Sequence, residues 1–199
     1  MRAACAVSCA IEPESVIIVA THTHVAPCTA NLVGDICPDF LETLEGAVAR
    51  AVGRATEDLE ESSLFAGTGY IQQMGWNRRG LHRDGSAGMY LGSWAEGFVG
   101  IEGPRDGSVP VIFARRPDGA LKAVITGFST HPNTLEGESF YSADIPGEVR
   151  RVLRAVLGED VGVVYFTGAA GNTAPSIMGD NPKNIQPWRG EQGLRRSGQ

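Results

Sequence analysis

The chain has 199 residues, of which 42% are hydrophobic and 20% are charged, a composition typical of a folded globular protein and not of a disordered tail. The length fits one domain or one part of a larger domain. The net charge is −6 and no basic cluster is present, so we expect no nucleic-acid partner. No stretch reaches the roughly 18–20 apolar residues of a membrane span, so we expect no transmembrane segment.

The N-terminal region contains a short apolar run and all four cysteines. A short apolar run over residues 3–11 is followed by Glu12-Pro13-Glu14, which does not fit a signal peptide, and it leaves the cellular compartment undetermined. Nothing in the sequence indicates an oligomeric state. The cysteines have neither a CxxC nor a paired zinc-knuckle spacing, so we expect free thiols. They are Cys5, Cys9, Cys28 and Cys37.

The first elements are a helix, a strand and a second helix. Residues 2–11 predict a helix that leads to a continuous β-branched run at 16–20, which is typical of a strand buried on both faces. That run ends in Thr21-His22-Thr23-His24. Apolar residues between Phe40 and Leu59 recur at steps of three and four. This spacing predicts a helix that packs on the core.

The middle of the chain predicts strands and a long loop. Residues 64–71 have a strand pattern, whereas residues 80–104 are rich in glycine and lack a period, which predicts a loop. Aromatic residues and a methionine in that loop either pack it down or line an apolar groove. They are Met89, Tyr90, Trp94 and Phe98. Residues 109–114 and 121–128 flank a turn at Pro117-Asp118-Gly119, and together they predict a β-hairpin.

The last elements are a helix, a strand and a loop. Pro146 suits the first turn of a helix that ends at Gly158. Residues 161–166 predict a buried strand, which leads into the glycine-rich segment 168–175. The polar sequence after Met178, including 180–199, predicts a loop. The whole pattern predicts an α/β fold with a mixed β-sheet and flanking helices.

Histidines follow two of the predicted strands. His22 and His24 follow the first, and His131 follows the strand at 121–128, while His82 lies in the predicted loop. Because strand ends that meet at one sheet edge are common places for sites, we expect a metal site at the C-terminal ends of strands. The two imidazoles of an HxH pair can serve one cation or one substrate.

The sequence does not fit two hydrolase classes that carry an HxH pair, nor does it fit a phosphate-binding loop. The metallo-β-lactamase pattern needs an Asp-His pair where this chain has Ala26-Pro27. Barrel amidohydrolases need about 250 residues of regular strand–helix alternation, and the predicted hairpin breaks that alternation. The glycines at 168–171 lack the Gly-Lys-Ser/Thr ending of a phosphate-binding loop.

Five motifs resemble the neutral/alkaline ceramidase family. Thr21-His22-Thr23-His24-Val25-Ala26-Pro27 resembles its HTHSGP signature, and Asn77-Arg78 resembles its Asn-Arg motif. Three further segments are similar in the same order. They are 130–134 around the second histidine, 142–147 like Ser-Gly-Asp-x-x-Gly, and 168–175 like Gly-Asp-x-Ser-Pro. The motifs cover roughly residues 2–180.

The resemblance implies a zinc-dependent hydrolase that cuts the N-acyl bond of ceramide or a related lipid amide into an amine and a fatty acid. His22 and His131 would be zinc ligands. His24 and Arg78 would face the scissile amide and its developing oxyanion. The family's other two ligands, a glutamate and a tyrosine, lie further downstream than this chain extends. An alternative for Arg78 is a surface or structural ion pair.

Other motif positions depart from the family or allow two interpretations. Asp144 either holds a ligand histidine or, as we favour, caps the helix near Pro146. Asn172 stands where the family has aspartate, and Ala174 stands where it has serine. A mechanism with a serine nucleophile therefore does not carry over to this chain, although Thr173 supplies a hydroxyl nearby. The mechanism that the resemblance still implies is direct attack on the amide by a metal-activated water.

We therefore expect residues 1–199 to be part of a ceramidase-like catalytic domain whose N- and C-terminal parts are missing. Two ligand histidines make an open, weak zinc site, so we expect the isolated chain to be inactive. One alternative is a non-catalytic member of the same fold that uses the metal for ligand binding. Another is an unrelated HxH metallohydrolase of esters or phosphoesters. Shared ligation requires imidazole nitrogens of His22 and His131 within about 3–4 Å of each other.

Overall fold

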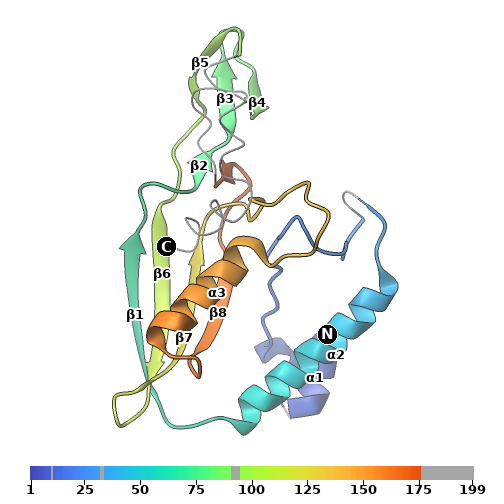
Figure 1. Ribbon diagram of the computed structural model, residues 1–199, viewed down its shortest axis with the longest axis vertical. Coiled ribbons are helices and arrows are strands. Elements are labelled where there is room, and N and C mark those ends of the chain that lie inside the picture. Colours follow the sequence, from blue (N-terminus) through green and yellow to red (C-terminus); the bar gives the residue numbers. More distant parts are fainter. Residues whose placement is uncertain (10, 32–33, 91–94, 176–199) are drawn as a thin grey trace. The chain divides into compact units, whose positions relative to one another are not determined.

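The computed structural model (Figure 1) describes residues 1–9, 11–31, 34–90 and 95–175. The chain forms two compact units. One consists of Met1–Val19 and Ala26–Glu61, and the other of Ala20–Val25 and Ser62–Gln199. No helix in the described ranges has the length and apolar character that crossing a membrane requires. The predicted loop at 180–199 and Trp94 lie outside the described residues.

The first unit is helical. It contains α1 (Arg2–Cys9), the short 3-10 helix η1 (Pro13–Ser15) and α2 (Pro38–Glu57), and α1 packs against α2. Both α-helices agree with the sequence pattern, but no residue of α2 is fully buried. Its neighbour within the unit, α1, has 8 residues against the 20 of α2, so it covers only part of the apolar stripe. The four cysteines are free, as predicted.

The predicted strand at 16–20 is wrong. These residues have no regular structure, and Ile17 is 77% exposed although Val16 is buried. A β-branched run favours extended backbone, but it becomes a strand only where a neighbouring strand accepts and donates its hydrogen bonds. The β-branched run at 16–20 therefore predicts an extended backbone, but it does not show whether a neighbouring strand is present to pair with it.

The second unit is built on a mixed sheet of four strands (Figure 1). Its order is β1 (Ser63–Tyr70), β6 (Ser108–Arg115), β7 (Leu121–Phe128) and β8 (Gly162–Thr167). The β1–β6 and β6–β7 pairs are antiparallel, whereas β7 and β8 are parallel. The predicted hairpin is confirmed as β6–β7. Its turn is closed by Gly119 at φ 87° and by Asp118, whose carboxylate accepts the Ala120 N–H at 2.9 Å.

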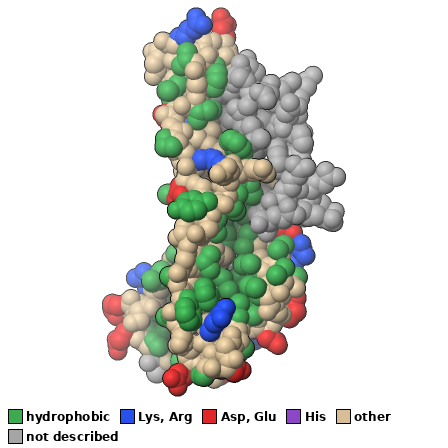
Figure 2. Space-filling model, turned by 90° about the vertical axis from the view of Figure 1, so that its left-hand side faces the viewer, with side chains coloured by type: hydrophobic (Ala, Val, Ile, Leu, Met, Phe, Trp, Pro, Cys, Tyr) green, Lys and Arg blue, Asp and Glu red, His purple; other side chains and the backbone are tan. Residues whose placement is uncertain are grey.

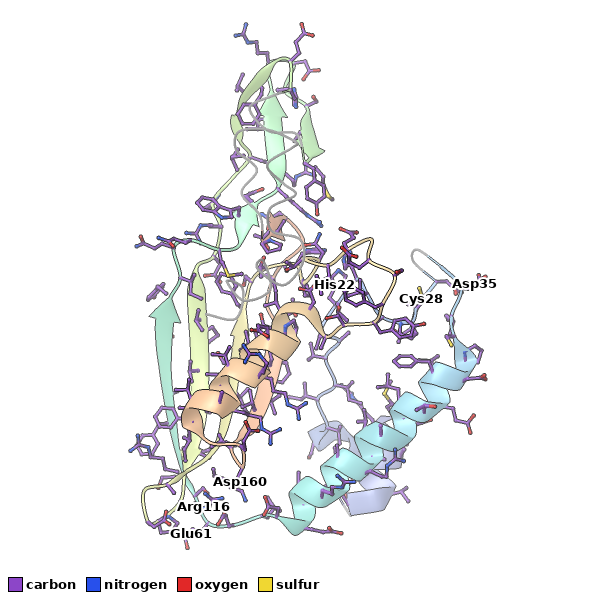
Figure 3. All side chains as sticks on the ribbon, viewed as in Figure 1. His22, Cys28, Asp35, Glu61, Arg116 and Asp160 are labelled. Atoms are coloured by element: carbon purple, nitrogen blue, oxygen red, sulfur yellow. The ribbon has the colours of Figure 1, made fainter. Side chains whose placement is uncertain are left out.

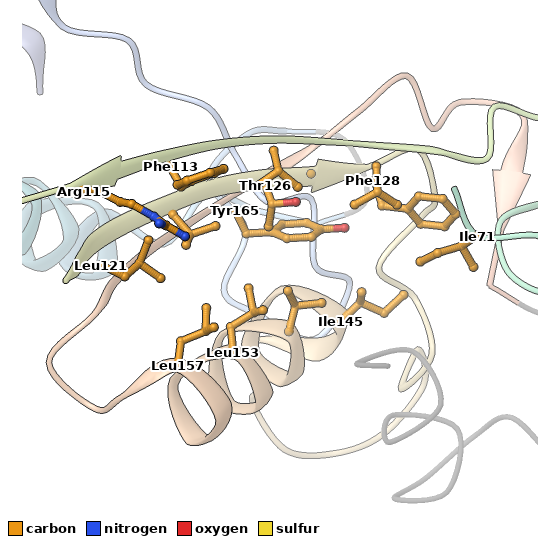
Figure 4. A pocket seen from close by; sticks show the side chains of 15 residues that line it. Ile71, Phe113, Arg115, Leu121, Thr126, Phe128, Ile145, Leu153, Leu157 and Tyr165 are labelled. Atoms are coloured by element: carbon orange, nitrogen blue, oxygen red, sulfur yellow. The ribbon is translucent and has the colours of Figure 1, made fainter. Parts of the chain in front are cut away.

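Helix α3 (Asp144–Leu157) connects β7 to β8 and lies against the sheet. A parallel pair needs such a crossover, and the predicted helix from Pro146 to Gly158 is confirmed with a start two residues earlier. Met74, Phe128 and Ile145 form the buried core beneath its N-terminal end. An apolar cavity of about 390 Å³ lies between the helix and the sheet, lined by residues of β6, β7, β8 and α3 (Figures 2 and 4).

The predicted loop at 80–104 is wrong, because much of it is a small antiparallel sheet. Its order is β4 (Ala87–Met89), β3 (Arg79–His82) and β5 (Phe98–Ile101). The glycine-rich sequence hides a tight turn between β3 and β4, in which Gly85 has φ 83° and Asp84 accepts the Ser86 N–H at 2.9 Å. A third sheet pairs β2 (Trp76–Asn77) with β9 (Thr173–Ala174).

Candidate metal centre

The candidate site lies at the edge of the sheet where the C-terminal ends of β7 and β8 are side by side. Phe128 and Thr167 are register partners, so the two strands deliver their following segments to one sheet edge. The Gly168 N–H donates to the Phe128 carbonyl at 3.1 Å. Three residues beyond β7, His131 is buried, and its Nδ1 donates to the Ala170 carbonyl at 2.5 Å. The parallel pairing thus fixes the orientation of the His131 ring.

The segment that carries His22 and His24 crosses this edge without being a strand. The hydroxyl of Thr167 donates to the Thr21 carbonyl at 2.6 Å, and that of Thr23 donates to the Ser142 carbonyl at 3.0 Å. The Ser142 N–H in turn donates to the Val25 carbonyl at 2.9 Å. Figure 3 labels His22 near the start of α3, in agreement with these bonds. The site lies at strand ends, as predicted, but only His131 reaches it from a strand.

Three imidazoles converge there. Nε2 of His22 lies 3.1 Å from Nε2 of His131, within the separation that shared ligation requires. One ring nitrogen from each of His22, His24 and His131 falls within 4.8 Å of the other two. The ring centroids are 4.7–5.3 Å apart, with edge-to-face orientations. His82, at the end of β3, is not part of this group.

The environment favours the neutral form of His131 and of His22. The pKa of His131 is lowered to about 4: burial is the largest cause, the hydrogen bond to the Ala170 carbonyl opposes it, and the nearby Arg78, His22 and His24 add smaller lowering effects. Burial also lowers the pKa of His22, with additional lowering by His24 and Arg78. Neutral imidazole is the form that binds metals. With Nδ1 bonded to a carbonyl, His131 presents the lone pair of Nε2, which is the usual arrangement of a metal-binding histidine. The residues therefore fit a divalent cation.

Arg78 lies beside the histidines and is only 8% exposed. Its Nε and Nη2 donate to the Gly171 carbonyl at 3.2 and 2.9 Å, and its Nη1 donates to the Tyr90 hydroxyl at 2.7 Å. Nη2 also lies 3.2 Å from Nε2 of His131. These partners are a carbonyl, a phenol and an imidazole, so the guanidinium faces the cluster, and among the described residues it has no carboxylate partner.

The other three predicted residues support the site from outside. Asp144 is 1% exposed, and its carboxylate accepts the N–H groups of Leu135 and Ile145 at 3.0 and 2.7 Å. Its described bonds thus join the loop after His131 to the start of α3. The Asn172 carbonyl accepts the Arg78 N–H at 2.8 Å. The buried Thr173 hydroxyl donates to the Ser129 carbonyl at 2.9 Å.

Sequence reasoning missed three residues that connect His24 to Arg78. Glu136 Oε1 lies 2.9 Å from Nδ1 of His24. Asn133 Nδ2 donates to Glu136 Oε2 and to the Tyr90 hydroxyl, both at 3.0 Å. For Glu136 the only signal was its closeness in sequence to His131. Asn133 lies within the motif at 130–134, and Tyr90 was named only as a residue that packs the predicted loop or lines a groove, so neither was given a role at the site.

Comparison with known proteins gives a structural match and no sequence match. No protein-family model matches the chain, and no curated protein matches it. The chain is similar to neutral ceramidase from Pseudomonas aeruginosa, with a TM-score of 0.66 and 20% identity over 90% of this chain. It is also similar to a ceramidase solved in complex with C2, with a TM-score of 0.65 and 19% identity over 90% of this chain.

The chain spans 29% of the length of the first ceramidase and 28% of the second. At such low identity the match establishes the fold and not the activity. It agrees with the resemblance of this sequence to the neutral/alkaline ceramidase family. The chain therefore has the fold of one part of neutral ceramidase, and it places three histidines of the ceramidase-like motifs at one sheet edge.

Proposed function

We propose that this chain is part of the catalytic domain of a zinc-dependent hydrolase of N-acyl amide bonds, with a lipid or lipid-like amide such as ceramide as substrate. The observation that carries the proposal is the 3.1 Å approach of two Nε2 atoms from histidines 109 residues apart. It occurs within a fold similar to that of neutral ceramidase. We further propose that the chain alone is inactive, since it spans a minor part of those enzymes.

In this proposal His22 and His131 hold the metal ion through Nε2. A zinc ion bound there would lower the pKa of a bound water to about 7 and polarise the substrate carbonyl. Nη2 of Arg78 lies 3.2 Å from Nε2 of His131 and also donates to the Gly171 carbonyl. If Nε2 of His131 held an ion it would no longer accept from Nη2, and this part of the guanidinium would be available as a donor for the oxyanion of the substrate. His24 would accept a proton at Nε2 from the attacking water and pass it to the amine nitrogen as the C–N bond of the amide breaks.

A nucleophilic side chain at the loop after β8 is not part of the proposal. Ala174 has no hydroxyl, and the hydroxyl of Thr173 is buried and donates to a carbonyl. The apolar cavity beneath α3 is lined by none of the three histidines, so it does not identify the substrate. The lipid amide is proposed from the similarity to ceramidases.

A second candidate is a non-catalytic member of the same fold that uses the metal to bind a ligand. Ala174 supports it, because this residue is 1% exposed and pairs with Trp76 in the β2–β9 ladder. The position is occupied by a packing residue where the resemblance leads one to expect a reactive hydroxyl. The two candidates differ in whether an amide is cleaved.

The test is hydrolysis of short-chain ceramide and simple N-acyl amines by this chain and by a longer protein that includes it. We expect no turnover by the chain alone, and chelator-sensitive turnover by the longer protein. Arg78→Met should lower kcat by about 10²–10³, the range for loss of one oxyanion donor. Arg79→Met is the matched control, since Arg79 is paired with Glu102 outside the histidine cluster. Turnover that a chelator leaves unchanged would overturn the zinc mechanism. Metal binding without any turnover would favour the second candidate.

A further inference from the structure

We infer that Glu136 is a positioning residue: it fixes His24 as the Nδ1–H tautomer and thereby directs the Nε2 lone pair of His24 into the histidine cluster. The inference deepens the proposed function and rests on it for its catalytic meaning. The tautomer itself is a property of this chain and needs no turnover to be measured.

The first step is the contact between the two side chains. Nδ1 of His24 and Oε1 of Glu136 are 2.9 Å apart. A carboxylate only accepts hydrogen bonds, so the proton in this bond belongs to the imidazole. Neutral imidazole carries one N–H, and with that proton on Nδ1 the other nitrogen keeps a free lone pair.

The second step is where that lone pair is available. The His24 ring centroid is 5.2 Å from that of His22 and 5.3 Å from that of His131, and the three histidines together satisfy the spacing of a metal site. With Nδ1 occupied by Glu136, Nε2 is the nitrogen of His24 that serves this cluster. A proton acceptor and a metal ligand both need an unprotonated nitrogen there.

The third step is that Glu136 is itself held. Its second oxygen, Oε2, accepts from Asn133 Nδ2 at 3.0 Å, and the same amide group donates to the Tyr90 hydroxyl. That hydroxyl accepts from Arg78 Nη1 at 2.7 Å. The carboxylate is thus attached on both oxygens, in a chain of hydrogen bonds that runs from Arg78 to His24. Such attachment fixes the rotamer of the carboxylate and the direction of its bond to the imidazole.

The fourth step is the parallel with His131. Its Nδ1 donates to the Ala170 carbonyl, and its Nε2 faces the cluster. A backbone carbonyl orients one imidazole and a carboxylate orients the other, and both acceptors are typical partners of functional histidines. The difference is that the acceptor of His24 is a side chain, so it can be changed by substitution.

The experiment is imidazole ¹H–¹⁵N correlation spectroscopy of the ¹⁵N-labelled chain at about pH 8.5, where imidazoles with ordinary pKa values are neutral, in the presence of a chelator. We expect the His24 signals of an Nδ1–H tautomer. Glu136→Ala should shift His24 toward the Nε2–H tautomer. Glu136→Gln should retain much of the Nδ1–H form, because its carboxamide oxygen still accepts. Glu138→Ala removes an exposed carboxylate from the same loop, whose described contact is its N–H bond to Leu135, and should change nothing.

A His24 ring in the Nε2–H form in the unaltered chain would overturn the inference, as would a spectrum that Glu136→Ala leaves unchanged. The signals of His82 report whether each variant is folded. In the longer protein, Glu136→Ala should also lower kcat by about 10–100-fold, the range for loss of such a partner, with Glu136→Gln closer to the parent. Absence of turnover with the expected tautomer would refute the proposed hydrolysis and leave the role of Glu136 intact.

Discussion

Asp144→Ala is expected to lower the free energy of unfolding by at least about 3 kcal/mol. The carboxylate is 1% exposed and accepts two backbone N–H groups, those of Leu135 and Ile145. Alanine would leave both donors buried without this partner, at about 1–3 kcal/mol each. Asp144 also has φ 48°, a left-handed conformation that disfavours alanine by about 1–2 kcal/mol. The substitution should therefore loosen the loop after His131 as well as the start of α3.

Urea unfolding of the chain measures this loss of stability, and two further variants serve as comparisons. Asp144→Asn should lose about half as much, because asparagine keeps one acceptor oxygen and tolerates the left-handed region. Asp118→Ala removes a similar carboxylate-to-backbone bond in the exposed β6–β7 turn and should lose no more than about 1 kcal/mol. A loss below about 1 kcal/mol for Asp144→Ala would show that this carboxylate does not hold the two segments together.

Stability measured with a chelator is expected to fall by about 3 kcal/mol as the pH drops from 6.5 to 4. Burial lowers the pKa of His131 to about 4 from its usual 6.5, a difference worth about 3 kcal/mol at 1.36 kcal/mol per pKa unit. Between these two values the unfolded chain binds a proton that the folded chain does not, so lowering the pH favours unfolding. The contribution of neutral His131 is complete above pH 6.5 and is lost below about pH 4. His22, whose pKa burial also lowers, acts in the same direction.

Unfolding free energies between pH 4 and pH 8 check the window and the sign. His131→Asn should remove most of the slope, while His82→Asn should keep it. The carboxylates of Asp84, Glu102 and Asp106 have a lowered pKa because they accept hydrogen bonds, so they lose their stabilising effect only in more acidic solution. An unaltered slope in His131→Asn would mean that the buried imidazole does not control the pH dependence.

Pairing was predicted correctly where the partner strand is close in sequence; the strand at 64–71 was predicted too, but not its pairing with the distant β6. The β6–β7 hairpin has its turn residues between the two strands, and α3 with β8 completes a crossover from β7. The run at 16–20 failed because a strand depends on a neighbour that the run does not specify. The sheet between residues 79 and 101 was missed because the Asp84-Gly85 turn lies among other glycines that also suggest a loop.

The site shows the same division. His22, His131 and Arg78 were predicted as site residues because each stands in a recognisable motif, and the structure brings their side chains together. Glu136 and Tyr90 act on the motif residues through side-chain geometry, and no motif contains them. For Asp144 the sequence allowed two roles, to hold a ligand histidine or to cap the helix near Pro146. Its described bonds go to the backbone N–H groups of Leu135 and Ile145 and not to a histidine.

The central claim is that His22 and His131 share one metal ion, and calorimetric titration of the chain with Zn²⁺ tests it most directly. We predict saturable binding of one equivalent, with the affinity lowered at least about tenfold by His22→Asn or His131→Asn, because each removes one of the two ligands. His82→Asn, which changes the histidine outside the cluster, should leave the affinity unchanged. Absence of binding, or equal affinities in all three variants, would contradict the account.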